Sequence, residues 1–183
     1  MSKRQQIIEA TLKLLIEKGV HNTPVSAIAK EAGTGMGTIY NYFPDKDALI
    51  NEIYVDIKNK EENTFLALST EQPIKTQFEV YYTALIDFFI KNPSYFNFME
   101  QLQASPIITI GSRNAGYKAV LPVTDLLQKG KEKRIIKPIE TDELLQFIGG
   151  SVFSYLRWYF KQANTNASTN SNQLQMVWDA IKT

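Results

Sequence analysis

Apolar residues recur at intervals of three and four along most of the 183-residue chain, which is the spacing of one face of an α-helix. Near the N-terminus, Ile8, Leu12 and Leu15 follow this spacing, and Gly19 stands where a left-handed residue commonly ends a helix. The β-prone residues 107–110 are isolated between helical patterns, so we expect a loop or a helix start there. The periodicity therefore predicts an all-α fold without a sheet.

Composition excludes several kinds of active site. The chain has no cysteine, which removes disulfides, zinc–thiolate sites and thiol nucleophiles. His21 is the only histidine, and without a second histidine or paired carboxylates it offers neither a metal site nor a catalytic triad. We therefore expect no enzyme activity, no cofactor and no metal, and a surface loop position for His21.

Neither a signal peptide nor a membrane helix is indicated. The N-terminus leads directly into a charged amphipathic segment, and the most apolar stretch, residues 144–160, contains polar residues and Arg157. We expect a cytoplasmic protein without membrane contact. Because the net charge is only +1, any DNA binding must come from a local arrangement of side chains.

Three glycines in five residues, Gly33, Gly35 and Gly37, raise the question of a phosphate-binding loop. A dinucleotide loop needs a preceding strand and the spacing G-x-G-x-x-G, whereas this chain has G-x-G-x-G after a helical pattern. A Walker loop ends in Gly-Lys-Ser/Thr, and here Gly37 is followed directly by Thr38. Two helices joined by a short turn containing glycine, a helix-turn-helix, fit the pattern better.

The two helices of this motif are short. Thr23, followed by a proline, suits the N-cap of the first helix. In the second helix Ile39 and Phe43 share one face, and Pro44 ends the segment because it cannot continue the hydrogen-bond ladder. Asp45 is expected to cap a long helix that continues into the rest of the chain.

Residues 25–49, VSAIAKEAGTGMGTIYNYFPDKDAL, match nearly position by position the signature T-x-x-x-IA-x-x-AG-x-x-x-GTIY-x-YF-x-x-K-x-x-L. Over residues 8–49 the chain resembles the TetR/AcrR family of transcriptional regulators. The resemblance implies an N-terminal three-helix DNA-binding domain over residues 1–48. It also implies a larger helical domain over residues 49–183, which binds an effector and forms a homodimer.

The resemblance also implies which residues touch DNA. The tyrosine hydroxyls and the Lys46 ammonium donate to phosphates, and the start of the second helix of the motif faces base edges. Alternatively, the tyrosines only cover the core of the small domain. The predicted DNA contacts are Thr23, Met36, Gly37, Thr38, Tyr40, Asn41, Tyr42 and Lys46.

Two departures from the family pattern bear on affinity. Gly35 and Met36 replace a polar residue and a cation, so the recognition helix carries no positive charge before Lys46. We expect affinity to rest on hydroxyls, amides and the N-terminal Lys3 and Arg4, with a modest dependence on salt.

The larger domain offers candidates for a pocket and for a dimer interface. Along residues 75–91 a narrow polar stripe on an apolar helix predicts a central, mostly buried helix, and Pro122 should kink a helix over residues 114–133. Aromatic side chains in this domain line either an apolar cavity or a plain core. The candidate pocket residues are Phe78, Tyr82, Phe89, Phe96, Met99 and Tyr117. Residues 142–162 and 173–181, with Gly149 and Gly150, are the expected dimer helices.

Together these features predict a repressor that binds a palindromic operator in double-stranded DNA as a homodimer and is released by a small-molecule effector. The two half-sites should lie about one helical turn, ~34 Å, apart or somewhat more. The alternative is a DNA-organising or partner-binding protein of the same fold that has no effector. The sequence leaves open the effector, the operator and the choice between repression and activation.

Overall fold

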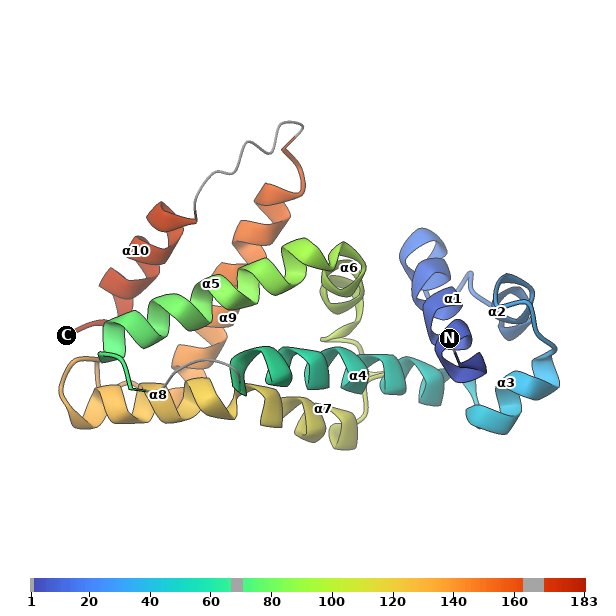
Figure 1. Cartoon of the computed structure of the whole chain (residues 1–183), viewed down its shortest axis with the longest axis horizontal. Helices are drawn as coiled ribbons and strands as arrows, with labels where there is room; N and C mark the ends of the chain where they lie inside the picture. Colours follow the sequence, from blue (N-terminus) through green and yellow to red (C-terminus); the bar gives the residue numbers. More distant parts are fainter. Residues whose placement is uncertain (1, 67–70, 163–169) are drawn as a thin grey trace. The chain divides into compact units, whose positions relative to one another are not determined.

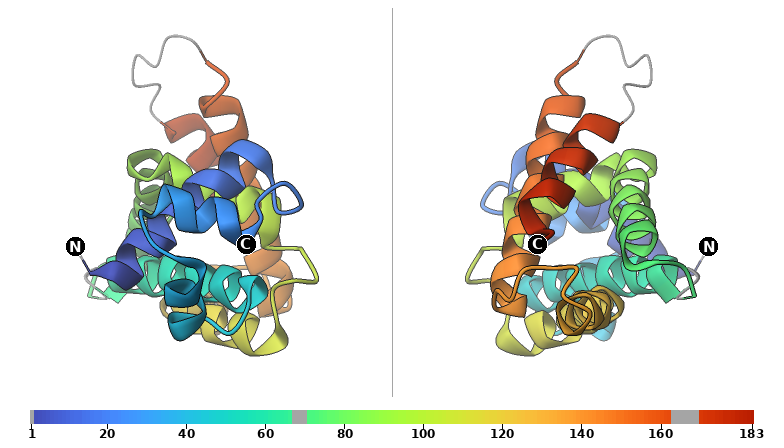
Figure 2. Two further views of the ribbon diagram at one scale, coloured as in Figure 1. Left: turned by 90° about the vertical axis from the view of Figure 1, so that its right-hand side faces the viewer. Right: turned by 90° about the vertical axis from the view of Figure 1, so that its left-hand side faces the viewer.

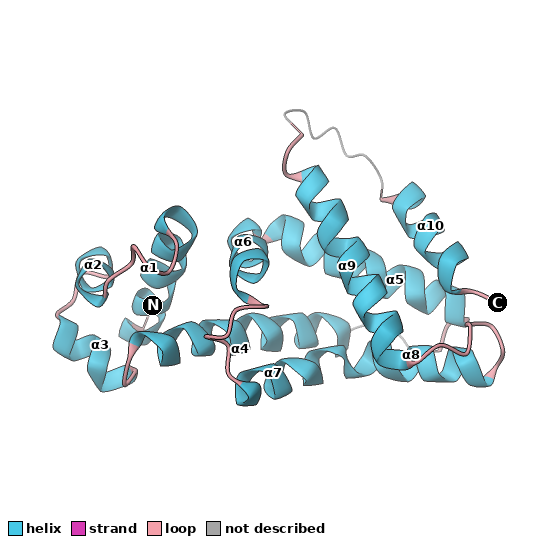
Figure 3. Ribbon diagram, turned by 180° about the vertical axis from the view of Figure 1, so that it is seen from behind, coloured by secondary structure: helices cyan, strands magenta, loops and turns pink. Residues whose placement is uncertain are grey.

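The regular elements of the protein are helices, as a computed structural model of the chain shows (Figures 1 and 3). The structure describes residues 2–66, 71–162 and 170–183. Within these ranges no strand is formed, apart from one isolated bridge between Ile136 and Lys182, which confirms the predicted all-α fold. The helices are α1 (Lys3–Lys18), α2 (Val25–Glu31), α3 (Met36–Tyr42), α4 (Lys46–Leu66), α5 (Ile74–Lys91), α6 (Pro93–Leu102), α7 (Ile110–Tyr117), η1 (Lys118–Val120), α8 (Leu121–Glu132), α9 (Thr141–Tyr159) and α10 (Ser171–Ile181).

The chain divides into two compact units. The first contains residues 1–59 and 92–116, and the second contains residues 60–91 and 117–183. The first unit thus holds α1, α2, α3, the first part of α4, and α6 with most of α7. The domain boundary expected at residue 48 follows the helix-turn-helix motif, whereas the compact unit also includes a segment from later in the chain. No helix in the described ranges is both long enough and apolar enough to cross a membrane.

The core of the first unit is built from the apolar faces that the periodicity predicts. Ile7 and Leu15 of α1, Ile28 of α2 and Ile39 of α3 are all buried. Helix α1 packs against α2 and α6, and α2 packs against α3. Gly19 ends α1 with a positive φ of 73°, which confirms its predicted role as a C-cap.

Side-chain hydrogen bonds hold the later segment, residues 92–116, in the first unit. The nearly buried amide of Asn51, on α4, donates from Nδ2 to the carbonyl oxygen of Ile107 over 2.8 Å and accepts from the backbone N–H of Thr109 over 2.9 Å. The Arg113 guanidinium donates to three carbonyl oxygens of the same loop, those of Gln103, Ser105 and Ile108. Buried polar groups need such partners, so Asn51 fixes the loop between α6 and α7 against α4.

In the second unit α5 is the central helix. It packs against α8, α9 and α10, and α9 and α10 pack against each other (Figure 2). Its buried side includes Phe78, Tyr82 and Phe89, in agreement with the predicted narrow polar stripe. The single kinked helix expected over residues 114–133 is instead two helices, α7 and α8, separated by the 3-10 turn η1. Pro122 lies in the first turn of α8, where its missing N–H leaves no hydrogen bond unmade.

Candidate nucleic-acid interface

The turn between α2 and α3 sets the direction in which α3 leaves the core. Gly33 has a positive φ of 58°, a conformation that side chains with a Cβ disfavour, and so it ends α2 as expected. The backbone N–H of Thr34 donates to the carbonyl oxygen of Ala29 over 2.9 Å and closes the turn. A Cβ placed on Gly35 or Gly37 would meet no atom within 4 Å, so the backbone at the start of α3 is open.

Helix α3 is held by one side and presents the other. Ile39 is 2% exposed, and Phe43, which directly follows the helix, is 3% exposed. Met36, Tyr40 and Tyr42 are each about half exposed. The outer face of α3, defined as Met36, Gly37, Tyr40 and Asn41, is solvent-accessible at every position, and Thr38 is half-buried. The structure therefore brings six of the eight predicted DNA-contact residues onto α3 with their side chains or backbone accessible, Tyr42 included.

Lys46 follows on the first turn of α4 and is held in place by backbone groups. Its Nζ donates to the carbonyl oxygens of Val20 over 2.9 Å and Thr23 over 3.3 Å. An ammonium group has three donor hydrogens, so one remains for a phosphate. Asp45 accepts from the backbone N–H of Ala48 over 2.7 Å, which confirms it as the N-cap of α4.

Thr23 is not available as a surface contact. Its side chain is fully buried, and its hydroxyl lies 2.8 Å from the Gly19 carbonyl oxygen and 3.2 Å from that of Leu14. The predicted N-cap role is also wrong, because Pro24 occupies that position and no side chain caps α2. Thr23 instead closes the connection between α1 and α2 from inside, and we leave it out of the interface.

Known proteins share this motif. Residues 7–53 match the family model described as bacterial regulatory proteins, tetR family. An HTH-type transcriptional regulator of Staphylococcus aureus is 29% identical over 160 residues, which cover 85% of this chain and 82% of the relative. The chain belongs to the TetR family of DNA-binding transcriptional regulators.

Two further comparisons differ in how much of this TetR-family chain they cover. The fatty acid metabolism regulator protein of Bacillus subtilis is 42% identical over 52 residues, which are 28% of this chain and 27% of the relative. A TetR-family transcription regulator from Shewanella sp. PV-4 superimposes with a TM-score of 0.92 over 100% of both chains at 21% identity. At that identity the likeness establishes the shared fold alone.

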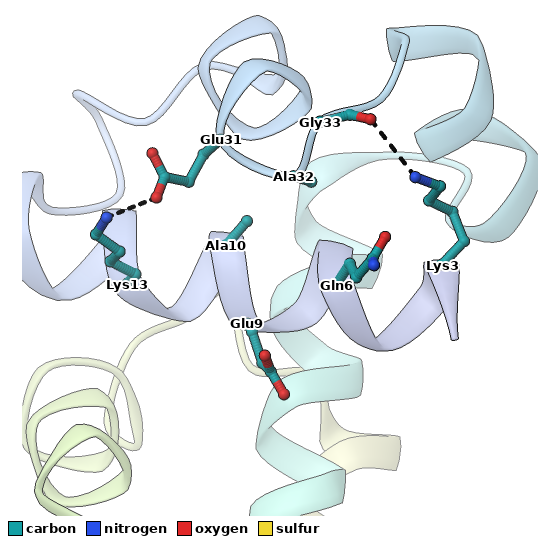
Figure 4. A pocket seen from close by; sticks show the side chains of 8 residues that line it. All are labelled: Lys3, Gln6, Glu9, Ala10, Lys13, Glu31, Ala32 and Gly33. Carbon is teal, nitrogen blue, oxygen red and sulfur yellow. Dashed lines mark hydrogen bonds and ion pairs between the residues drawn. The ribbon is translucent and has the colours of Figure 1, made fainter. Parts of the chain in front are cut away.

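The two N-terminal cations expected to support DNA binding differ in their surroundings. Arg4 forms an ion pair with Glu52, and its guanidinium lies 5.6 Å from the centre of the Phe43 ring. Lys3 lies at the turn before α3, with its Nζ 3.5 Å from the Gly33 carbonyl oxygen (Figure 4). Because Arg4 is already paired with a carboxylate, Lys3 is the better placed of the two to add positive charge near α3.

A shallow groove of about 550 Å³ runs between α1 and the end of α2 (Figure 4). Lys13 forms an ion pair with Glu31 at 2.6 Å, which lowers the pKa of the Glu31 carboxyl and raises the pKa of the Lys13 ammonium. Lys3 and Glu9 complete the charged lining, so two positive and two negative charges balance. We assign no ligand to this groove.

The second unit of this TetR-family protein encloses a cavity of about 60 Å³. Phe78 and Tyr82, two of the six predicted pocket residues, line it together with Phe65, Tyr81, Leu85, Val120, Val123, Leu145, Ile148, Gly149 and Val152. The Tyr82 hydroxyl lies 3.0 Å from Ser151 Oγ, and burial raises the pKa of Tyr82.

The other four predicted pocket residues have different surroundings. Phe89 packs its ring against that of Phe153, with centroids 5.5 Å apart. Phe96 and Met99 are buried on α6, which belongs to the first unit. Tyr117 is half exposed, and its hydroxyl donates to Asp142 over 2.9 Å, which raises the pKa of Tyr117. The six residues therefore do not line one common cavity.

Replacing Thr23 by valine separates a structural role from a phosphate contact. The change keeps the shape of the side chain but leaves buried carbonyl oxygens without their donor, so the free energy of unfolding should fall by about 1–3 kcal/mol. Urea denaturation measures this loss, and Ser26→Ala, which removes an exposed hydroxyl on α2, is the matched control. DNA affinity at a temperature where both variants are folded should not change. If Thr23 contacted a phosphate, the valine variant would instead bind DNA more weakly without a loss of stability.

Proposed function

We propose that this TetR-family protein is a repressor that binds a palindromic operator as a homodimer and is released by a small-molecule effector. The observation that supports DNA binding most directly is the outer face of α3, which is accessible along its whole length while Ile39 holds the opposite side in the core. A helix that is anchored on one side and exposed on the other can enter the major groove of DNA. The proposed location is the cytoplasm, where the DNA is.

Within this proposal the exposed side chains have two tasks. The hydroxyls of Tyr40 and Tyr42, together with the remaining hydrogen of the Lys46 ammonium, bind phosphates and fix the orientation of α3. Met36, Gly37, Thr38 and Asn41 face base edges. The half-exposed state of both tyrosines favours this role over the alternative that they only cover the core.

Genome-wide selection of bound DNA fragments with the purified protein yields the operator and the spacing of its half-sites. On that operator the double variant Tyr42→Phe with Lys46→Ala should bind about 10-fold to 100-fold more weakly, because two charge-assisted or polar phosphate contacts are lost. The logarithmic slope of affinity against salt should fall by about one, and unrelated sequences should be weakened equally. Fluorescence anisotropy at several salt concentrations measures both quantities.

The matched control is Tyr117→Phe with Lys118→Ala, the same chemical change at exposed positions of the second unit. Its DNA affinity should equal that of the wild type. Because Lys46 also holds the turn before α2, unfolding curves accompany the binding data. A loss of affinity that only follows a loss of folded protein, or no loss at all, would contradict the phosphate roles.

Exposed apolar residues on α9 and α10 support the homodimer. Phe147, Gly150, Ser154 and Trp158 recur at helical spacing along one accessible side of α9, and Met176 is exposed on α10. Helices α9 and α10 lie next to each other (Figure 2). A Cβ on Gly150 would meet no atom within 4 Å, so the protomer itself leaves that position open. Two copies that pair α9 and α10 would bury this surface as a four-helix contact. A two-fold dimer in turn requires a palindromic operator.

Charges placed on this surface should separate the protomers. Phe147→Glu with Trp158→Glu should sediment as a monomer, because pairing would bury two carboxylates without partners. The control Val80→Glu, at an exposed apolar position of α5, should remain a dimer. Sedimentation velocity distinguishes the two masses. A wild-type protein that is monomeric at micromolar concentration, or a double variant that stays dimeric, would rule out this interface.

The cavity beside Phe78 and Tyr82 is the proposed effector site. Its lining is apolar, so a small apolar ligand, or the apolar part of an amphipathic one, suits it. Release from DNA then requires that the ligand bind more tightly to an arrangement that does not fit the operator. At about 60 Å³ the cavity must widen to hold anything beyond a few atoms.

A thermal-shift screen of metabolites tests this part of the proposal. A true effector should raise the melting temperature and also weaken operator binding. Gly149 lines the cavity, and a Cβ there meets no atom within 4 Å, so Gly149→Leu should fill the space and abolish both responses to the same compound. If no compound produces both responses, the alternative function as an effector-free DNA-organising or partner-binding protein is favoured.

A further inference from the structure

The outer face of α3 has no charged side chain. The helix reads MGTIYNY, and the next cation along the chain, Lys46, is already bound to two carbonyl oxygens. Arg or Lys donating to guanine O6 and N7 is the commonest specific contact in the major groove. Helix α3 cannot make that contact, so it must recognise bases through other chemistry.

Met36 is an isolated apolar group on this face. It is 49% exposed, and its neighbours Gly35 and Gly37 have no side chains. The space beside both glycines is open, and about half of the Met36 side chain is accessible. Methionine is unbranched and adaptable, which suits close contact with a small apolar target. On the major-groove edges of the bases, the one apolar group is the C5-methyl of thymine.

Asn41 supplies the matching polar group. It is exposed, stands four residues after Gly37 on the same face, and its side-chain amide has no hydrogen-bond partner in the part of the chain that the structure describes. A free amide can accept from adenine N6 and donate to adenine N7 at the same time. The thymine methyl and the N6/N7 edge of adenine both belong to an A·T pair. The apolar and the polar group of α3 therefore indicate the same kind of base pair.

We propose that α3 reads A·T pairs in each half-site, with Met36 against a thymine methyl and Asn41 on an adenine. This inference rests on the proposed DNA-binding role of α3 and adds to it the chemistry of the sequence that is recognised. Tyr40 and Tyr42 serve this readout only by positioning the helix on the backbone.

Operators with single-atom changes test the thymine contact. Each thymine of the selected operator is replaced in turn by uracil, which removes only the methyl group. At one or two positions in each half-site, uracil should weaken wild-type binding about fourfold, the effect expected for one buried methyl group. Met36→Ala should bind the thymine and uracil operators equally, whereas Tyr40→Phe should weaken both while keeping their ratio.

The adenine contact is tested in the same way with 7-deazaadenine, in which a C–H group replaces the N7 acceptor. At one position in each half-site this base should weaken wild-type binding about 10-fold, and Asn41→Ala should no longer distinguish it from adenine. Folding of each variant is checked by its melting temperature.

The outcomes separate this inference from the proposed function. If the wild type binds its operator but Met36→Ala does not remove the effect of any uracil substitution, the thymine contact is overturned while DNA binding stands. If Asn41→Ala does not remove the effect of any 7-deazaadenine substitution, the adenine contact is overturned. If the selection recovers no operator at all, the proposed DNA-binding function itself fails.

Discussion

The burial of Ile39 and Phe43 is the constraint on which the presentation of α3 depends. A helix of seven residues is not stable in isolation, because too few hydrogen bonds follow its costly nucleation. Helix α3 therefore keeps its form through these two side chains, both almost completely buried in the first unit. Every group on its outer face takes its direction from that anchoring. The open glycines around Met36 are tolerable for the same reason, since packing and not intrinsic propensity maintains the helix.

Polar groups that bind backbone carbonyls complete the scaffold around α3. Thr23 and Lys46 both donate to carbonyl oxygens in the connection between α1 and α2. On α4, Asn51 holds the loop between α6 and α7 through its side-chain amide. Threonine, lysine and asparagine are polar residue types that, from the sequence alone, would be expected to face DNA or solvent. Their role inside the unit limits which cations and hydroxyls remain for phosphates, and it leaves the tyrosines and Lys46 as the proposed backbone contacts.

The division into units bears on the proposed release by an effector. Helix α4 continues from the first unit into the second at residues 59–60, and the segment 92–116 returns to the first unit between α5 and η1. The chain therefore crosses between the units three times, at residues 59–60, 91–92 and 116–117. A change in the second unit thus has three covalent routes into the DNA-binding unit, besides the proposed interface between protomers. Only a difference in ligand affinity between two arrangements can bias such a system.

The sequence by itself determined the helical fold, the helix-turn-helix with its glycine turn, the family, and the exposed face of α3. These depend on residues close together in the chain, whose spacing fixes which side of a helix is apolar. Only the tertiary structure decided that Thr23 is buried, that Lys46 binds the carbonyls of Val20 and Thr23, and that residues 92–116 join the first unit. It also decided that Phe78 and Tyr82 share a cavity to which the other predicted pocket residues do not contribute. Such outcomes depend on which backbone groups and helix faces meet across tens of residues, and apolar periodicity is the same whether an aromatic side chain lines a cavity or fills a core.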